Sequence, residues 1–166
     1  MIVILPYESA VEQVDALVED LPMECRPAEP VSDIKQMYND KRDQYNTRGY
    51  VRHCSRAART EGHLVLGVTG VDLFSAGHDF VFGSAQVGGH GGVISIYRLG
   101  EGEELRERML KEAIHEIGHI VGLTHCDDSS CVMFFSNTLV ETDNKSDGYC
   151  AECQKEYEEL KLERIN

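Results

Sequence analysis

The chain has 166 residues, of which 42% are hydrophobic and 27% charged, and its 16 basic and 29 acidic side chains give a formal net charge of -13. This length suits a single domain with a buried core, and the composition is that of a globular protein without repeats or low-complexity tracts. The negative charge excludes nucleic acid and anionic membranes as expected partners, and no apolar stretch approaches the roughly 20 residues of a membrane helix.

The N-terminal part is predicted to begin with a strand and a helix. Residues 2–5 form an apolar run without preceding basic residues, which indicates a buried strand rather than a signal peptide. A helix is expected from Ser9, which together with Glu12 resembles a capping box. Three prolines then predict a loop or short strand, and a second helix is expected between residues 32 and 58, with a break near Gly49.

Three strands are predicted in the middle of the chain. Apolar and partly alternating residues indicate strands, and a glycine-rich turn, "GGHGG", separates the last two. The segments are "HLVLGVTG" (63–70), "FVFGSAQV" (80–87) and "VISIYRL" (93–99).

The long helix that follows is the most strongly patterned element. It is predicted from Leu105 to about Val121, and Gly122 stands where a glycine cap ends a helix. The chain up to Gly148 is expected to be mostly loop, followed by a helix over residues 151–162. Because strands and helices mix without a strict βαβ rhythm, the predicted fold class is α+β.

The stretch "HEIGHIVGLTHC", which begins at His115, carries the pattern of a metal site. His115 and His119 are one helical turn apart, so both imidazoles can reach one zinc ion at about 2.0–2.1 Å. Glu116 stands next to the first ligand and can accept a proton from a zinc-bound water. Gly122 allows the chain to turn back, so that His125 supplies a third ligand. Three protein ligands leave a fourth position open, which indicates a catalytic site.

The cysteines indicate a second metal site. Six cysteines in a chain expected to be cytoplasmic favour metal ligation over disulfides. Two pairs in the last quarter fit a structural zinc with four thiolate ligands: Cys126, Cys131, Cys150 and Cys153. Since Cys126 follows His125, this zinc would anchor the loop of the third histidine. A redox role for the last pair lacks a thioredoxin-like context. Cys25 and Cys54 are expected to be small buried hydrophobic side chains.

These motifs resemble the metzincin clan of zinc metallopeptidases, and the His–Cys junction with its trailing cysteines is similar to the archaemetzincin family. The matching residues, "HEIGHIVGLTHC…CVM…CAEC", cover about a quarter of the chain. The resemblance implies a catalytic zinc on the three histidines, a structural zinc on the four cysteines, Glu116 as general base, and Met133 in a turn beneath the ligands. It also implies one metallopeptidase domain (1–166), with an N-terminal subdomain of sheet and helices (1–121) and a smaller, irregular C-terminal subdomain (122–166).

The predicted function is zinc-dependent hydrolysis of peptide bonds by a cytoplasmic monomer whose partners are peptides or proteins. "FVFGSAQV" is the candidate edge strand to which an extended substrate adds. Two alternatives stay open: a metal-dependent endoribonuclease with the same histidine spacing, and a zinc-stabilised binding module without catalysis. Glu116 counts against both, and the negative charge counts against binding RNA. Tyr97 and Tyr149 are candidate oxyanion donors, although packing roles are expected, and no specificity pocket can be assigned.

Overall fold

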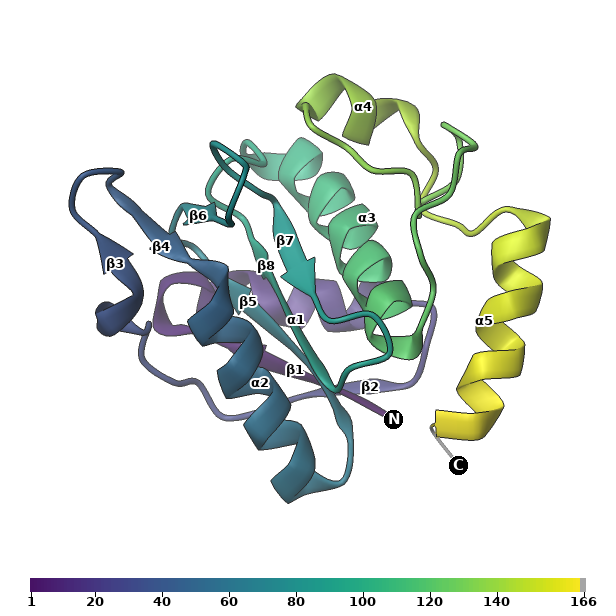
Figure 1. Cartoon of the computed structure of the whole chain (residues 1–166), viewed down its shortest axis with the longest axis horizontal. Coiled ribbons are helices and arrows are strands. Elements are labelled where there is room, and N and C mark those ends of the chain that lie inside the picture. Colours follow the sequence, from purple (N-terminus) through teal and green to yellow (C-terminus); the bar gives the residue numbers. More distant parts are fainter. Residues whose placement is uncertain (165–166) are drawn as a thin grey trace.

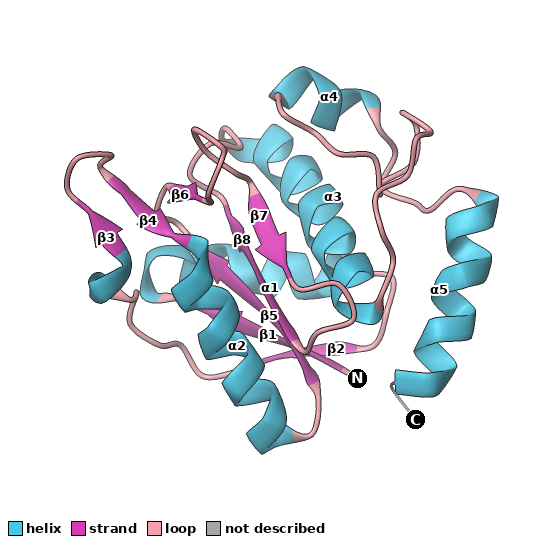
Figure 2. Ribbon diagram, viewed as in Figure 1, coloured by secondary structure: helices cyan, strands magenta, loops and turns pink. Residues whose placement is uncertain are grey.

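The structure is a computed structural model and describes residues 1–164. Its strands are β1 Ile2–Pro6, β2 Cys25–Pro27, β3 Tyr38–Asn39, β4 Gln44–Asn46, β5 Leu64–Thr69, β6 Leu73–Phe74, β7 Gly83–Ala85 and β8 Gly91–Ser95. They form a five-stranded sheet, in the order β2-β1-β5-β8-β7, and a three-stranded sheet, in the order β3-β4-β6 (Figure 2). In the larger sheet, β7 is an edge strand and pairs antiparallel with β8, whereas the other neighbours are parallel.

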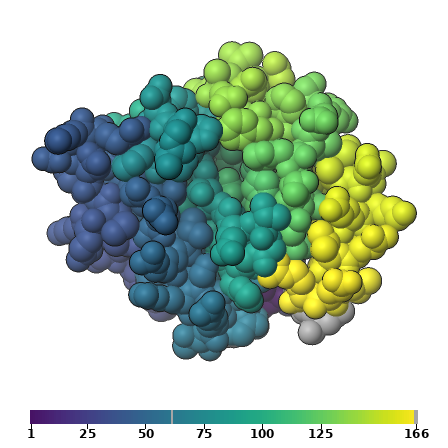
Figure 3. Space-filling model, in the orientation of Figure 1, coloured from purple at the N-terminus to yellow at the C-terminus, as the bar shows by residue number. Residues whose placement is uncertain are grey.

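Helices cover both faces of the larger sheet. The helices of the described residues are α1 Val11–Asp20, α2 Thr47–Glu61, α3 Gly102–Val121, α4 Leu139–Asn144 and α5 Ala151–Arg164, with 3-10 turns at Glu8–Ala10 and Lys35–Met37. Helix α2 lies on one face, and α1 and α3 lie on the other (Figure 1). Residues after α3, coloured from green to yellow, make up one side of the molecule (Figure 3). None of the helices within the described residues is long and apolar enough to cross a membrane.

Alternation along the central strands builds a core on each face of the sheet. Ile4 of β1 and Leu66 of β5 pack with α1 and α3, while Val3 and Val65 belong to the core under α2. Strands buried on both faces have continuous rather than alternating apolar sequences. The predictions of buried strands at residues 2–5 and 63–70 are confirmed, and so is the α+β fold class.

Helix α3 has its predicted C-terminal end. It begins slightly earlier than expected, at Gly102, and ends at Val121. Gly122 follows with φ 134° and ψ -1°, a conformation that L side chains rarely adopt. Its amide donates to the carbonyl of Gly118 at 3.0 Å, and the amide of Leu123 donates to the same oxygen at 2.9 Å. The chain therefore leaves the helix abruptly and turns back towards it.

The second helix is shorter than the prediction over residues 32–58, which is wrong for the first part of that segment. The residues before Thr47 form a 3-10 turn and short strands instead. Asn46 begins the helix, because its side chain accepts from the amide of Arg48 at 2.9 Å. Gly49 lies inside the helix and does not interrupt it. Glycine is needed at this position for packing, because a Cβ there would overlap the side chain of Met37.

The capping box predicted at Ser9 is also absent. Helix α1 begins at Val11 and has no side-chain hydrogen bond at its cap. The hydroxyl of Ser9 instead lies 3.2 Å from that of Thr69 and accepts from the amide of Gly70 at 2.8 Å. A tertiary contact with the end of β5 thus takes the group that was expected to cap the helix.

The segment predicted as mostly loop before Gly148 contains helix α4. This helix has a capping box: the hydroxyl of Thr138 accepts from the amide of Glu141 at 3.3 Å, and the Glu141 carboxylate accepts from the amide of Thr138 at 3.0 Å. Four charged or polar residues among its six hide the pattern of an amphipathic helix. The predicted helix over residues 151–162 is confirmed as α5.

The two strands next to α3 are shifted from their predicted positions. Strand β8 begins at Gly91, within the segment predicted as a glycine-rich turn, and β7 is reduced to three residues. A Cβ at Gly91 would lie 2.7 Å from the carbonyl carbon of Cys54 in α2. The absence of a side chain at Gly91 therefore lets α2 pack closely against this strand. The predicted edge position of "FVFGSAQV" is confirmed for β7.

Candidate metal centres and active site

Three imidazoles converge at the C-terminal end of α3. His115 and His119 project from one face of the helix, and His125 comes from the chain that turns back after it. The Nε2 atom of His119 lies 3.1 Å from Nε2 of His115 and 3.1 Å from Nε2 of His125. Nitrogen ligands of one tetrahedral zinc ion stand about 3.3 Å apart. The three side chains therefore fit a shared metal ion.

Backbone carbonyls orient the two helical imidazoles. Nδ1 of His115 donates to the carbonyl of Val132 at 2.8 Å, and Nδ1 of His119 donates to the carbonyl of Leu123 at 2.8 Å. This arrangement leaves both Nε2 lone pairs free for a metal. Burial is the largest cause that lowers the pKa of both imidazoles, and the positive charge of Lys145 lowers it further. Both effects favour the neutral form, which is the form that binds zinc.

Glu116 is buried between α3 and the edge strand β7. Its Oε2 atom has no hydrogen-bond partner among the described residues. Burial raises the pKa of this carboxyl well above its usual range, Glu112 raises it further, and Lys145 opposes the shift. A Cβ on Gly83 of β7 would lie 2.6 Å from Oε1 of Glu116, so only glycine leaves room here. A buried carboxylate oxygen without a partner is costly in a folded protein and indicates a functional group.

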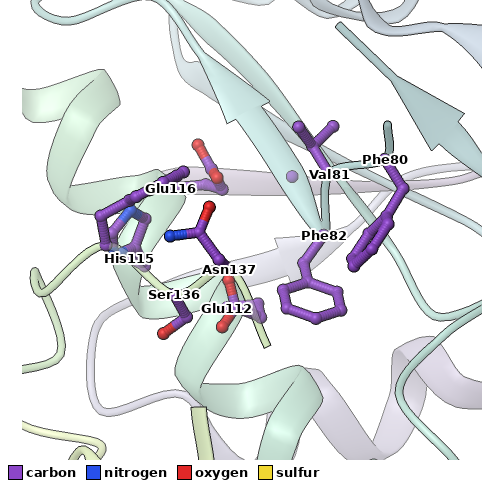
Figure 4. A pocket seen from close by; sticks show the side chains of 10 residues that line it. Phe80, Val81, Phe82, Glu112, His115, Glu116, Ser136 and Asn137 are labelled. Carbon is purple, nitrogen blue, oxygen red and sulfur yellow. The ribbon is translucent and has the colours of Figure 1, made fainter. Parts of the chain in front are cut away.

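A small pocket adjoins Glu116. Figure 4 shows Phe80 and Phe82 on one side of it and His115 and Glu116 on the other. Its volume is about 30 Å³, which is space for roughly one or two water molecules. The remaining lining residues are Val81, Gly83, Glu112, Phe135, Ser136 and Asn137.

Met133 lies in a tight turn that contacts α3. The turn is closed by the amide of Phe134, which donates to the carbonyl of Cys131 at 3.0 Å. The Met133 side chain is fully buried, and a Cβ on Gly118 would lie 2.5 Å from its sulfur. The carbonyl of Met133 accepts from the amide of Cys126 at 3.0 Å. The glycine within "HEIGH" thus makes space for Met133, and the turn is bonded to the residue that follows the third histidine.

The four cysteines of the last quarter also converge. Their Sγ atoms all lie within 4.8 Å of one another, and those of Cys126 and Cys150 are 3.9 Å apart. Thiolates bound to one tetrahedral zinc at 2.3 Å stand about 3.8 Å apart. The amide of Cys153 donates to the Cys150 sulfur at 3.5 Å and is the largest cause of the lowered pKa of that thiol. All six cysteines are free thiols, so this cluster fits a metal rather than disulfides.

The other two cysteines lie away from this cluster, in the apolar cores. Cys54 of α2 is fully buried against the sheet, and burial raises the pKa of its thiol to about 12. Cys25 is half-buried, and its thiol donates to the carbonyl of Val18 at 3.7 Å. Both side chains act as small apolar groups, as predicted, although Cys25 is less buried than expected.

The two candidate oxyanion donors have different environments in the structure. The hydroxyl of Tyr149 already donates to the carbonyl of Ile114 at 3.1 Å, and its ring stacks on Tyr157 at 4.9 Å between centroids. The side chain of Tyr97 is 63% exposed to solvent. A packing role, as expected from the sequence, describes Tyr149.

Several residues in or beside the pocket were not predicted from the sequence. Glu112 precedes Glu116 by one helical turn, and this spacing was a readable signal that both carboxylates share a face of α3. Gly83 and Lys145 carried no such signal, because each reaches Glu116 or Glu112 only through tertiary contacts.

Comparisons with known proteins agree on one family. A model of the family described as peptidase family M54 matches residues 27–159. The archaemetzincin of Archaeoglobus fulgidus is 44% identical over 127 residues, which cover 75% of this chain and 76% of the relative. The archaemetzincin of Pyrococcus furiosus is 42% identical over 139 residues, which cover 78% and 72%. The crystal structure of archaemetzincin from Methanopyrus kandleri is 33% identical, with a TM-score of 0.86, and the alignment covers 99% of this chain and 96% of that one.

Proposed function

The chain belongs to peptidase family M54, the archaemetzincins, and is a zinc metallopeptidase; from its site we propose which residues carry out the hydrolysis. We assign the catalytic zinc to His115, His119 and His125, and the role of general base to Glu116. The observation that supports this assignment best is the convergence of three Nε2 atoms beside a buried carboxylate oxygen without a hydrogen-bond partner. The comparisons favour neither an endoribonuclease nor a non-catalytic binding module.

The chemistry divides between the metal and Glu116. When bound, zinc supplies the Lewis acidity that polarises the scissile carbonyl and makes a water molecule more acidic. Glu116 accepts the proton of the attacking water and passes it to the nitrogen of the leaving amine as the C–N bond breaks. A base is most effective when its pKa lies near the working pH, and burial moves the pKa of Glu116 in that direction.

We further propose that the four clustered cysteines hold a second, structural zinc, so that each chain binds two zinc ions. The support is the mutual proximity of the four sulfurs and the backbone amides that donate to them. This site would hold α5 and the chain from Gly122 onward as the smaller subdomain (122–166), against the larger one (1–121). Met133 would form the turn beneath the catalytic metal.

An extended peptide is the proposed substrate, bound along β7. This strand has a sheet neighbour on one side only, and its Gly83 adjoins Glu116. Addition of a strand to a sheet edge binds a peptide through its backbone, which places a scissile bond near the metal without demanding a particular sequence.

We also propose that the protein acts as a monomer in the cytoplasm, on peptides or proteins rather than on nucleic acid or membranes. Six free thiols fit a reducing compartment. The net charge of -13 disfavours binding to other polyanions.

A cleavage screen tests the proposed function. The zinc-loaded protein is incubated with a mixed peptide library and, in parallel, with unstructured RNA. We expect slow peptide cleavage that a chelator abolishes and added zinc restores. Cleavage of RNA without cleavage of any peptide would overturn the proposal in favour of an endoribonuclease.

A further inference from the structure

A lysine is buried beside the pocket, and the mechanism above does not use it. The side chain of Lys145 is 0% exposed, and its Nζ lies 3.2 Å from Oε1 of Glu112. Nζ also donates to the carbonyl of Phe134 at 3.4 Å. Withdrawing two charges from water costs about as much as their attraction returns, so a buried ion pair is weak evidence of a contribution to stability. The position of this pair indicates another role.

The partner of Lys145 belongs to the pocket of the proposed base. Glu112 lies one helical turn before Glu116 on α3, and both line the pocket together with His115 (Figure 4). The hydroxyl of Thr142 donates to the same Oε1 of Glu112 at 3.2 Å. Glu112 therefore connects the ammonium of Lys145 and the hydroxyl of Thr142 to the helix that carries Glu116.

The second contact of Lys145 reaches the backbone next to the pocket. Phe134 immediately precedes three residues, 135–137, that also line the pocket. The ammonium therefore joins the start of this pocket segment to Glu112 of the helix. The backbone amide of Lys145 is itself fixed, because it donates to the carbonyl of Glu141 at the end of α4 at 3.2 Å.

Other contacts already hold α4 against α3. Arg108 forms two hydrogen bonds to Asp143, at 2.7 and 2.8 Å, and Nζ of Lys111 donates to the carbonyl of Thr142 at 3.1 Å. These exposed or half-exposed contacts join the same two helices outside the pocket. A purely structural clamp would not need a buried ammonium as well.

We propose that Lys145 is a positioning residue of the peptidase site. Its ammonium bridges Glu112 of α3 and the carbonyl of Phe134, and so holds the pocket residues 135–137 that follow Phe134 in place beside α3. The inference rests on the proposed function, and it assigns to Lys145 an effect on turnover rather than on zinc binding, because backbone carbonyls orient the two helical histidines and burial, not Lys145, is the main cause that keeps them neutral.

The test compares three variants with the wild-type protein. Lys145→Met alone leaves Glu112 buried without a counter-charge, so instability would confound its reading. Lys145→Met/Glu112→Gln removes both charges and keeps an acceptor for Thr142. Asp143→Asn is the matched control, since it weakens an ion pair between the same helices outside the pocket. The readouts are kcat, KM, melting temperature and zinc content per chain.

We expect the double variant to regain the melting temperature and zinc content of the wild type, with KM within about threefold, while kcat stays roughly 10- to 100-fold lower, the usual effect of losing an outer-shell partner. Asp143→Asn should keep kcat at a temperature well below its melting point. The proposal is overturned if the double variant regains kcat together with stability, if it stays as unstable as Lys145→Met, or if Asp143→Asn loses as much turnover. A wild-type protein without peptidase activity would overturn the proposed function itself.

Discussion

At the scale of single residues, Glu116 combines full burial with an oxygen that has no hydrogen-bond partner among the described residues. Such an oxygen is costly to folding and is retained where it serves chemistry. Its neighbours divide the tasks around it: histidines would bind the metal, Gly83 leaves room for the carboxylate, and Lys145 compensates the second carboxylate of the pocket.

Substitution of Glu116 by glutamine separates catalysis from folding. We expect kcat for peptide cleavage to fall by roughly 10²- to 10⁴-fold, the range for loss of a general base. The zinc content and melting temperature should stay unchanged or rise slightly, because a buried ionisable group is replaced by a neutral one of the same shape. Peptide kinetics, elemental analysis and thermal unfolding measure these effects. A variant that retains half of the wild-type kcat would exclude Glu116 as the base.

His53 provides a pH-dependent contribution to stability far from the metal sites. Burial lowers the pKa of its imidazole, and Arg56 lowers it further; Nδ1 lies 2.8 Å from the buried hydroxyl of Tyr7. Because the folded pKa lies below the unfolded value of about 6.5, the unfolded chain binds more protons as the pH falls through this window. Folding stability should therefore decrease as the pH falls, by at most about 1.4 kcal/mol per pH unit from this group.

Urea unfolding of the zinc-saturated protein at pH 7.5 and 5.5 measures this effect. In His53→Gln the decrease in the free energy of unfolding between the two pH values should be smaller than in the wild type, since the titrating group is gone. The comparison cancels the contributions of all other histidines. Parallel pH profiles for the two proteins would contradict the prediction.

At the scale of elements, the edge strand β7 acts on the site through the absence of a side chain. A Cβ at position 83 would lie 2.6 Å from Oε1 and 2.9 Å from Cγ of Glu116. In Gly83→Ala the carboxylate must shift, and a displacement of about 1 Å can cost on the order of 10²-fold in rate. We expect kcat to fall at least roughly tenfold with zinc content unchanged. Ser84→Ala is the control, because neighbouring residues of a strand face opposite sides; equal losses in both variants would refute this reading.

The cysteine site should determine the order of the C-terminal elements. Cys150→Ser removes one of the four proposed thiolate ligands just before α5, and metal binding of this kind contributes directly to folding. We expect a loss of roughly 3 kcal/mol or more in the free energy of unfolding, because loss of a metal ligand belongs to the substitutions with large effects on stability, and a melting temperature lower by about 6–12 °C. Amide hydrogen exchange should show lost protection in residues 151–164. Full protection of α5 in the variant would argue against a structural metal there.

The elements that were predicted correctly are those whose pattern is local. The end of α3 at Gly122 and the buried strands β1 and β5 follow from periodicity and from one glycine conformation. The course of α2 through Gly49 and the uncapped start of α1 depend on distant partners, Met37 against Gly49 and Thr69 against Ser9, which no local pattern records. The candidate site likewise has residues that a local pattern predicts and others that depend on distant partners.

Histidine and cysteine spacing indicated which ligands could share a metal, because the required geometry follows from one helix and one turn. The environment of Glu116 could not be predicted, because it is assembled from β7, α3 and the residues after α4. Lys145 illustrates the limit: its segment was expected to be loop, yet its ammonium is buried against a helix more than thirty residues earlier in the chain.

At the scale of the whole molecule, the two proposed metal sites are joined by a single peptide bond. His125 and Cys126 are adjacent, and the amide of Cys126 donates to the carbonyl of Met133 in the turn beside α3. Loss of the structural metal would therefore loosen the third ligand of the catalytic one. This connection is the physical reason why the irregular segment after α3 can present the third proposed ligand, His125, to the metal.

The overall charge of the protein should influence which substrates it prefers. A net charge of -13 creates a negative potential around the molecule. Beside the pocket, Lys145 is paired with Glu112, so the attraction acts at long range rather than through a specific contact with Glu112. Backbone pairing with β7 adds little sequence preference. We therefore expect kcat/KM to be higher for extended peptides that carry lysine or arginine than for acidic peptides of the same length.

This preference should weaken as salt is added, because exposed charges are screened beyond a Debye length of about 8 Å at physiological ionic strength. The experiment measures kcat/KM for matched basic, neutral and acidic peptides at low and at high salt. A neutral peptide whose rate does not change with salt is the control for effects on the enzyme itself. Equal rates for acidic and basic peptides at low salt would refute the charge argument and leave the peptidase assignment intact. A basic preference that persists at high salt would instead indicate a short-range contact with an acidic side chain, because long-range attraction is screened under those conditions.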